Sequence, residues 1–213
     1  IDQPMVSSGR RIVVASRDGI LYAIDPLTKA VPWQVGVGRH GDRVSRLAVH
    51  GQTVFLGTVS AEVTAISVGT GHAKWISRVG ASVLAAPGVS QDGKWVAVGT
   101  TRGTVEVLDA ESGSLVAKLS TENEILSQPM FLGDLLVVGS TDNALYVYSM
   151  TTGKVEYMEE FESDIALDLC SLGRHVFLCT SSGEVHCVAP RERRVVWSRK
   201  DAGGEKSWTA LSA

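Results

Sequence analysis

The sequence has little of several features that define whole classes of protein. Its 213 residues include only three cysteines, Cys170, Cys179 and Cys187. Three thiols cannot all pair with one another, so the count favours a reducing compartment such as the cytoplasm over a disulfide framework. No stretch reaches the roughly 18 consecutive apolar residues that a membrane-spanning helix needs. The sequence therefore predicts a protein without a membrane span.

An excess of positive charge is missing as well. The formal net charge is −3 and the isoelectric point is about 6.0, so nothing marks a nucleic-acid-binding surface. Hydrophobic residues make up 44% of the chain, which is enough for a buried core. The chain starts at Ile1 without a basic and apolar leader. We expect either that a leader was removed or that the chain is a segment of a longer protein.

What the sequence does contain is a repeat of about 40 residues. Turn dipeptides recur with spacings of 42, 42, 40 and 40, at Asp18-Gly19, Ser60-Ala61, Arg102-Gly103, Asp142-Asn143 and Ser182-Gly183. Gly and Asn tolerate the positive φ of a tight two-residue hairpin turn, so we expect a β-hairpin at each position. Ala61 fits this turn least well, and we expect a looser turn there.

Each hairpin lies in a unit with four strand-like segments and an aromatic residue at a fixed place. Runs such as "VFLGT" precede the turn, and alternating runs such as "EVTAIS" follow it. A second turn comes next, and the position after it holds Trp33, Trp75, Ala117, Tyr157 and Trp197 in the five units. We expect these aromatic side chains, Ala117 excepted, to pack between neighbouring units.

Four antiparallel strands per unit of about 40 residues are typical of a β-propeller blade. The sequence thus predicts an all-β propeller domain with blades at residues 3–38, 45–80, 85–120, 127–161 and 167–203. Residues 204–213, with Trp208, are expected to begin a further blade or to form a closing strand. Two arrangements remain: a closed ring of five blades, or a sector of a larger ring of seven or eight blades.

The segment "LYAIDPLTKAVPW" resembles the repeat of the quinoprotein-like (PQQ-repeat-like) propeller family. Ala23, Asp25, Thr28, Lys29 and Trp33 match its pattern of Ala-x-Asp, a Thr-Gly-Lys turn and Trp. WD repeats are the nearest rival, but no unit ends its third strand with Trp-Asp. The resemblance covers nearly the whole chain and implies the propeller fold rather than a particular activity.

The family implies several functions. Its members include dehydrogenases that bind pyrroloquinoline quinone, a periplasmic lipoprotein that assists outer-membrane assembly, and propellers fused to amino-acid-activating enzymes. The quinone enzymes resemble eight-bladed discs with calcium in the funnel, and some place a pair of adjacent cysteines over the cofactor. This chain has five units and no adjacent cysteines. We therefore predict no cofactor.

Reactive groups are sparse in the sequence. If the last hairpin turns on Ser182-Gly183, Cys179 faces His186, and Cys187 faces Leu178 on the other side of the sheet. That geometry leaves too few ligands for zinc and argues against a Cys179–Cys187 disulfide. No nucleophile-elbow motif occurs either. We predict no catalytic, cofactor-binding or metal-binding residues.

Charge is segregated between two connections of the same structural class. "GRHGDR" places Arg39 and Arg43 between the first and second units, and "VEYMEEFESD" places Glu159, Glu160 and Glu162 between the fourth and fifth. Both connections should open on one face of the disc. They form either a solvated rim or a bipolar docking face for a partner.

We therefore predict a non-catalytic propeller that serves as a protein–protein interaction or scaffold module within a larger protein. The alternatives are a fragment of a PQQ-dependent dehydrogenase, an outer-membrane assembly factor, or the propeller of an amino-acid-activating enzyme. The expected partners are proteins rather than nucleic acid.

Overall fold

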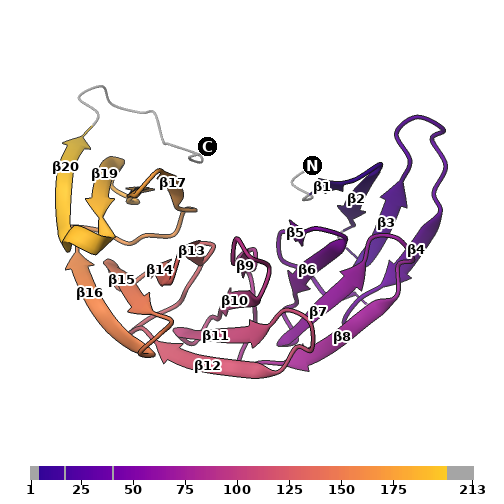
Figure 1. The fold of residues 1–213 in the computed structure, drawn as a ribbon, viewed down its shortest axis with the longest axis horizontal. Coiled ribbons are helices and arrows are strands. Elements are labelled where there is room, and N and C mark those ends of the chain that lie inside the picture. Colours follow the sequence, from indigo (N-terminus) through magenta and orange to yellow (C-terminus); the bar gives the residue numbers. More distant parts are fainter. Residues whose placement is uncertain (1–4, 17, 40, 201–213) are drawn as a thin grey trace.

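The computed structural model describes residues 5–16, 18–39 and 41–200. They form five sheets of four antiparallel strands, each built from strands consecutive in sequence. The sheets stand side by side around an open arc, with β1, β5, β9, β13 and β17 inside and β4, β8, β12, β16 and β20 outside (Figure 1). The all-β propeller architecture is confirmed. The expectation for residues 204–213 and Trp208 lies outside the described residues.

The strand bounds show the repeat directly. The first blade has β1 (Met5–Ser8), β2 (Arg11–Ala15), β3 (Ile20–Ile24) and β4 (Trp33–Gly36), and the second has β5 (Ala48–His50), β6 (Thr53–Gly57), β7 (Glu62–Ser67) and β8 (Ala73–Arg78). The third has β9 (Gly88–Val89), β10 (Trp95–Gly99), β11 (Thr104–Asp109) and β12 (Leu115–Ser120). The fourth has β13 (Met130–Leu132), β14 (Leu135–Gly139), β15 (Ala144–Ser149) and β16 (Lys154–Glu160).

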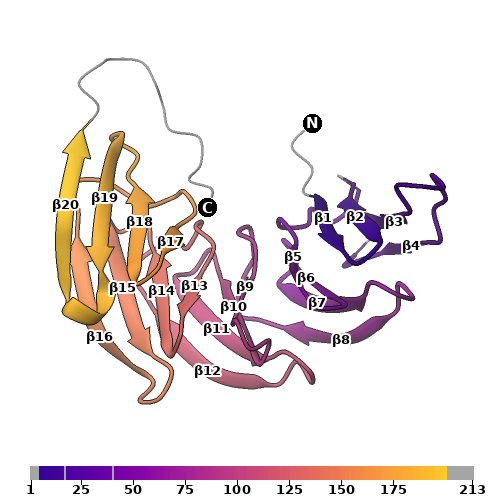
Figure 2. The ribbon, with the colours of Figure 1, turned by 45° about the horizontal axis from the view of Figure 1, so that its top comes forward.

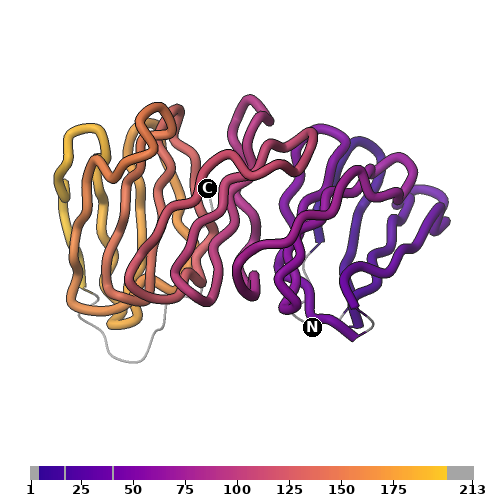
Figure 3. Tube along the Cα trace, turned by 90° about the horizontal axis from the view of Figure 1, so that it is seen from below, coloured from indigo at the N-terminus to yellow at the C-terminus, as the bar shows by residue number. Residues whose placement is uncertain are grey.

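The fifth blade has β17 (Cys170–Leu172), β18 (His175–Cys179), β19 (Glu184–Ala189) and β20 (Arg194–Lys200), with the short 3-10 helix η1 (Pro190–Glu192) before its last strand. Figure 2 shows β18 between β17 and β19 in this blade. Seen from the side in Figure 3, the strands of all blades run between two edges, where every turn and connection lies. No helix of the described residues has the length and apolar character to cross a membrane.

The core consists of four separate clusters, one at each junction between neighbouring blades. At the junction of the second and third blades, for example, Phe55 and Ala65 from one blade pack with Val96 and Leu108 from the next. The middle strands of the second, third and fourth blades are buried on both faces, whereas β2 and β3 of the first blade, which has a neighbour on one side, alternate between buried and half-buried residues. Each blade is therefore stabilised mainly by its neighbours.

The hairpins between the second and third strands have three-residue loops, not the two-residue loops that the dipeptides suggested. In the second blade, the Thr58 N–H donates to the Glu62 carbonyl and the Ala61 N–H donates to the Thr58 carbonyl. The residue that precedes the third strand has a positive φ, which is +64° at Ala61 and +83° at Gly183. This geometry is a type I turn followed by a left-handed residue. Ala61 adopts it like the others, so the expected looser turn was wrong.

The extra loop residue shifts the strand register by one. Cys179 pairs with Val185, Leu178 with His186, and Phe177 with Cys187. The prediction that Cys179 faces His186 was therefore wrong, because side chains alternate between faces and a shift of one residue exchanges them. Cys179 and Cys187 lie on one face of the sheet, and His186 lies on the other.

The recurring aromatic residue packs against the turn of the following blade. The Trp75 indole N–H donates to the Ala110 carbonyl over 3.0 Å, and its ring lies against Gly113, which has a φ of +73°. Trp33 does the same with Val68 and Gly71 one blade earlier, with a donor–acceptor distance of 2.9 Å. The small Ala23 and Ala65 lie opposite these indoles in the sheet, which leaves room for the rings.

The other three units vary this contact. Tyr157 is half-buried at the junction of the fourth and fifth blades. Trp197 packs on Phe177 of its own blade, and 44% of it is exposed. Where the third unit has Ala117, the fully buried Tyr148 from the fourth blade enters the junction instead, and its hydroxyl donates to the Ser120 carbonyl over 2.6 Å.

Candidate functional site

The two charged connections lie on the same face of the arc. Because each blade runs through its four strands in order, the connections between blades and the hairpins between second and third strands lie at the same edge. Hydrogen bonds join the two sets: the Val59 N–H donates to the Arg43 carbonyl over 3.1 Å, and the Phe161 N–H donates to the Asn143 carbonyl over 2.8 Å. We call this edge the connection face. It carries the basic connection (37–47) and the acidic connection (161–169).

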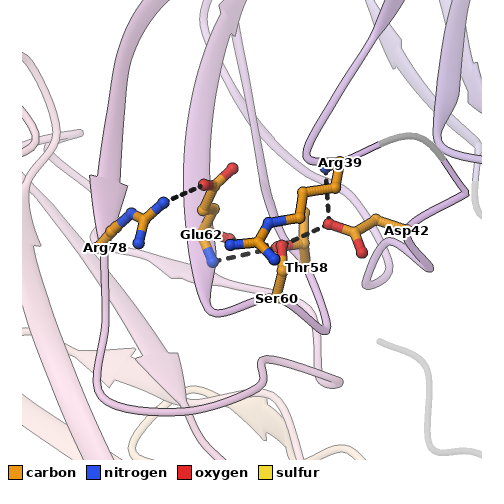
Figure 4. Close-up of polar contacts among 6 residues, drawn as sticks. All are labelled: Arg39, Asp42, Thr58, Ser60, Glu62 and Arg78. Atoms are coloured by element: carbon orange, nitrogen blue, oxygen red, sulfur yellow. Dashed lines mark hydrogen bonds and ion pairs between the residues drawn. The ribbon is translucent and has the colours of Figure 1, made fainter.

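Asp42 organises the basic connection. Its carboxylate accepts a hydrogen bond from the Arg39 backbone N–H over 2.8 Å and another from the Ser60 hydroxyl (Figure 4). These bonds, first the one from Ser60, lower the pKa of Asp42. The loop depends on Gly38, since a Cβ there would lie 2.6 Å from an Asp42 carboxylate oxygen. Arg39 and Arg43 are both exposed on the loop that results.

The neighbouring hairpin is held by local polar contacts. The Glu62 N–H donates to the Thr58 hydroxyl over 3.1 Å, and the Arg78 guanidinium, which points toward Glu62 in Figure 4, forms an ion pair of 3.5 Å with its carboxylate. Arg78 is thus paired within its blade. Sequence reasoning missed the part played by Asp42, although the glycines at 38 and 41 indicate a tightly turned loop.

On the acidic side, two of the three glutamates predicted for the connection lie in β16 instead. It ends at Glu160, so Glu159 and Glu160 belong to the strand and only Glu162 belongs to the connection. Glu160 and Glu162 are exposed, whereas Glu159 is half-buried and accepts a hydrogen bond from the Tyr157 hydroxyl. Burial, followed by this hydrogen bond, raises the pKa of Tyr157. The strand continues because its pairing with β15 runs through Ala144 and Glu160.

The connection face is therefore polarised along the arc. The connection between the third and fourth blades adds Glu122 and Glu124 to the acidic half, and the one between the second and third blades (79–87) carries no charged residue. No hydrogen bond or ion pair within the described parts of the chain joins Arg39 or Arg43 directly to the three predicted glutamates. The structure places the five residues on one face but at opposite parts of it.

Little reactive chemistry is visible elsewhere. Within the described ranges, no three His, Cys, Asp or Glu side chains converge on a point where a metal ion could bind. All three cysteines are free, and burial raises the pKa of each thiol. His186 is buried between Phe161 and Ser198, whose hydroxyl lies 2.7 Å from Nδ1. Burial lowers the pKa of His186, and nearby carboxylates, Glu184 first, oppose that shift.

Comparison with known proteins agrees with this architecture. A family model described as "Outer membrane protein assembly factor BamB" matches residues 1–82 and 77–210. The chain belongs to this family. The resemblance to the PQQ-repeat propellers is thereby confirmed.

Individual relatives are distant and longer. The BamB of Burkholderia pseudomallei is 28% identical over 139 residues, which cover 62% of this chain and 36% of that protein. The BamB of Shewanella oneidensis is 21% identical over 211 residues, covering 92% of this chain and 52% of that protein. A beta-alanine-activating enzyme of Danio rerio is 32% identical over 104 residues, covering 46% of this chain and 9% of the enzyme. The chain thus spans about half or less of these relatives.

Solved structures show the same fold. The crystal structure of BamB from Moraxella catarrhalis superposes with a TM-score of 0.75 at 21% identity, covering 91% of this chain and 62% of that one. The computationally designed Ika8 protein gives a TM-score of 0.80 at 19% identity, covering 92% and 61% of the two chains. At such identities the likeness establishes the fold and nothing more.

Proposed function

We propose that this propeller is a non-catalytic module that binds protein partners through its connection face, in the manner of an assembly factor. The observation that supports this most is the charge polarity of that face, with exposed Arg39 and Arg43 at one part and exposed Glu160 and Glu162 at another. The family name, an assembly factor, supports the same kind of role. A partner with the opposite charge order would be steered onto such a face.

The test is kinetic and uses the full-length protein with a partner first identified by pull-down. Glu160 and Glu162 are reversed to lysine together, because they are exposed, whereas Glu159 contacts Tyr157 and its reversal would disturb a blade junction. We expect association to slow by about tenfold at low salt and much less at high salt, since salt screens exposed charges. Folding should be unaffected because exposed charges contribute little to stability.

The matched control is the double reversal of Glu111 and Glu156, which lie toward the opposite edge and are also exposed. Glu156 forms an ion pair of 3.7 Å with Arg193, and because both side chains meet solvent its loss should leave the fold intact. It changes the net charge equally. If both double variants slow association to the same degree, the effect comes from overall charge and the connection face is not the docking site. If neither slows it, the acidic residues only keep the protein soluble.

We also propose that the five blades are a sector of a larger ring. Trp197 supports this. Its side chain occupies the position of Trp75 in the blade, but it is exposed because no further blade covers it among the described residues. The opposite end supports it too, since a hollow of about 480 Å³ lies on the first blade beside Ile20, Gln34 and Gly36. The stability cost of replacing Trp197 in the full-length protein tests this arrangement.

A further inference from the structure

Polar contacts join the inner ends of all four connections on the inner side of the arc. The residues involved occupy nearly equivalent places just before the inner strands: Arg46, Pro87, Gln128 and Asp168. The Gln128 side-chain amide donates to the Pro87 carbonyl over 2.9 Å, and the Gln128 backbone N–H donates to an Asp168 carboxylate oxygen over 3.0 Å. The other Asp168 oxygen forms an ion pair with the Arg46 guanidinium. The contacts thus run from the third blade to the fourth, the fifth and back to the second.

The ion pair between Arg46 and Asp168 differs in kind from the others in the described chain. Every other ion pair there joins residues of one blade or of neighbouring blades, such as Arg191 with Asp134. Arg46 precedes β5 and Asp168 precedes β17, so their contact spans from the second blade to the fifth. It joins two blades that share no sheet and no apolar cluster.

Both residues of this bridge stand next to buried residues of their connections. The residues beside Arg46 are the buried Ser45 and Leu47, and the Ser45 N–H donates to the Gly57 carbonyl over 2.8 Å. Next to Asp168 is the buried Leu169, and the carboxylate itself is only 15% exposed. The Arg46 side chain is 52% exposed, so among these groups it alone loses freedom when the ion pair forms. The ion pair therefore links the position of the basic connection to that of the acidic connection.

A closing contact has mechanical importance in an arc of repeated units. Each blade packs only on its neighbours, so small deviations at successive junctions add up along the array. Three junctions separate the second blade from the fifth. A direct contact between these two blades limits the sum of the three deviations, even if it adds little to overall stability.

We propose that Arg46 and Asp168 form a clasp that fixes the separation of the basic and acidic connections and so sets the geometry of the connection face. Arg46 belongs to the basic connection, and Asp168 to the acidic one. The functional meaning of the clasp rests on the docking role proposed above, but its structural action does not. Arg46 and Asp168 are positioning residues, and the partner would contact the exposed charges that they hold in place.

The experiment measures the separation without any partner. Spin labels are attached to cysteines introduced at Arg43 and Glu162 in the full-length protein, and the distance distribution is recorded by pulsed electron paramagnetic resonance. The native chain, without the two introduced cysteines, gives the background from Cys170, Cys179 and Cys187. Asp168→Arg should shift the distribution to longer distances and broaden it, because two positive charges, at positions 46 and 168, then repel each other. Arg46→Asp should do the same.

Rescue separates an ion pair from a packing effect. The double exchange of Arg46→Asp with Asp168→Arg should restore the native distribution, and Arg102→Glu, a charge reversal on a hairpin tip of the third blade, should leave it unchanged. Single variants that leave the distribution native would overturn the clasp, whatever a partner does. So would a double exchange that remains as broad as the single variants while the circular dichroism stays native. Single variants that broaden the distribution but bind the partner at the native rate would instead count against the docking proposal alone.

Discussion

Trp75 and Trp197 occupy the same place in their blades and have opposite surroundings. Each lies in the outer strand of its blade, Trp75 in β8 and Trp197 in β20. Each packs on a phenylalanine of its own blade, with ring centroids 5.9 Å apart for Phe55–Trp75 and 6.1 Å for Phe177–Trp197. Trp75 is 9% exposed because the turn of the third blade covers it, whereas Trp197 is 44% exposed. The aromatic residue is therefore a contact between blades, and its contribution to stability depends on the blade that follows.

The largest effect is expected from removing Trp75. Trp75→Ala should lower the free energy of unfolding by about 3–5 kcal/mol, the range for large aromatic residues in cores, because it empties the second junction. Trp197→Ala in the chain of residues 1–213 should cost much less, since a large part of that ring already meets solvent. Urea denaturation followed by fluorescence and circular dichroism compares the two.

The same pair tests the sector arrangement. In the full-length protein, Trp197→Ala should cost nearly as much as Trp75→Ala if a further blade covers Trp197. A small cost in both chain lengths would mean that no blade packs there, and the proposal of a larger ring would fail.

The glycine beneath the indole gives the next largest effect. Gly113→Ala should destabilise by about 1–2 kcal/mol through the left-handed backbone and by about 1–3 kcal/mol more through overpacking, because its Cβ would lie 2.6 Å from the Trp75 ring. Gly153 has a similar φ of +67° but open space around it, so Gly153→Ala should show only the backbone cost. Equal losses in thermal denaturation would show that the indole does not need the glycine.

A smaller effect is expected at the junction that lacks a tryptophan. Tyr148→Phe removes the hydroxyl that donates to the Ser120 carbonyl of the third blade and should cost about 1 kcal/mol. Tyr146→Phe removes a bond to Asp142 within the fourth blade and serves as the control. Hydrogen exchange should accelerate in β12 for the Tyr148 variant and not for the Tyr146 variant. Faster exchange of β12 in both would assign the effect to the fourth blade as a whole.

The smallest effect is a pH dependence at the last junction. His186 occupies the position that Thr64 has in the second blade, and burial lowers its pKa in the folded protein below the ordinary 6.5. As the pH falls through 6.5, the unfolded chain takes up a proton that the folded chain resists, so the free energy of unfolding should decrease. Above pH 6.5, His186 does not make the free energy of unfolding depend on pH.

His186→Gln should flatten this dependence between about pH 6.5 and 5. The carboxyls with lowered pKa, such as Asp25 and Asp109, titrate below their ordinary value of 3.8 and stay outside this window. An unchanged slope in the variant, measured as urea midpoint against pH, would mean that another group is responsible.

The blade count and the aromatic register could be predicted because each depends on local periodicity. Hydrophobic alternation and turn residues recur within every unit, and Trp33 and Trp75 share a place with Trp197 in the sequence itself. The length of the hairpin loops could not be predicted, because Ser-Gly fits loops of two or three residues. The additional loop residue decides which face of the sheet His186 occupies. The positive φ at Ala61 could not be predicted either, because alanine does not favour that conformation.

Contacts between units were harder to foresee. Tyr148 fills the space left by Ala117. This replacement could be predicted only by knowing which faces of the third and fourth blades pack together. The ion pair of Arg46 and Asp168 depends on the curvature of the arc from the second blade to the fifth, which three junctions set together. For the candidate site, charge segregation placed the residues on one face, while Asp42 and its hydrogen bonds emerged only from the structure.

The construction of every sheet from four consecutive strands has a consequence for how the chain folds. Strand partners are always neighbours in sequence, so closing each hairpin costs little loop entropy, and such local contacts form early. The blades can therefore assemble one after another as the chain leaves the ribosome, each adding to the surface of the last. Arg46 must wait until the fifth blade has begun before it meets Asp168, which makes that contact a late event in the maturation of the arc.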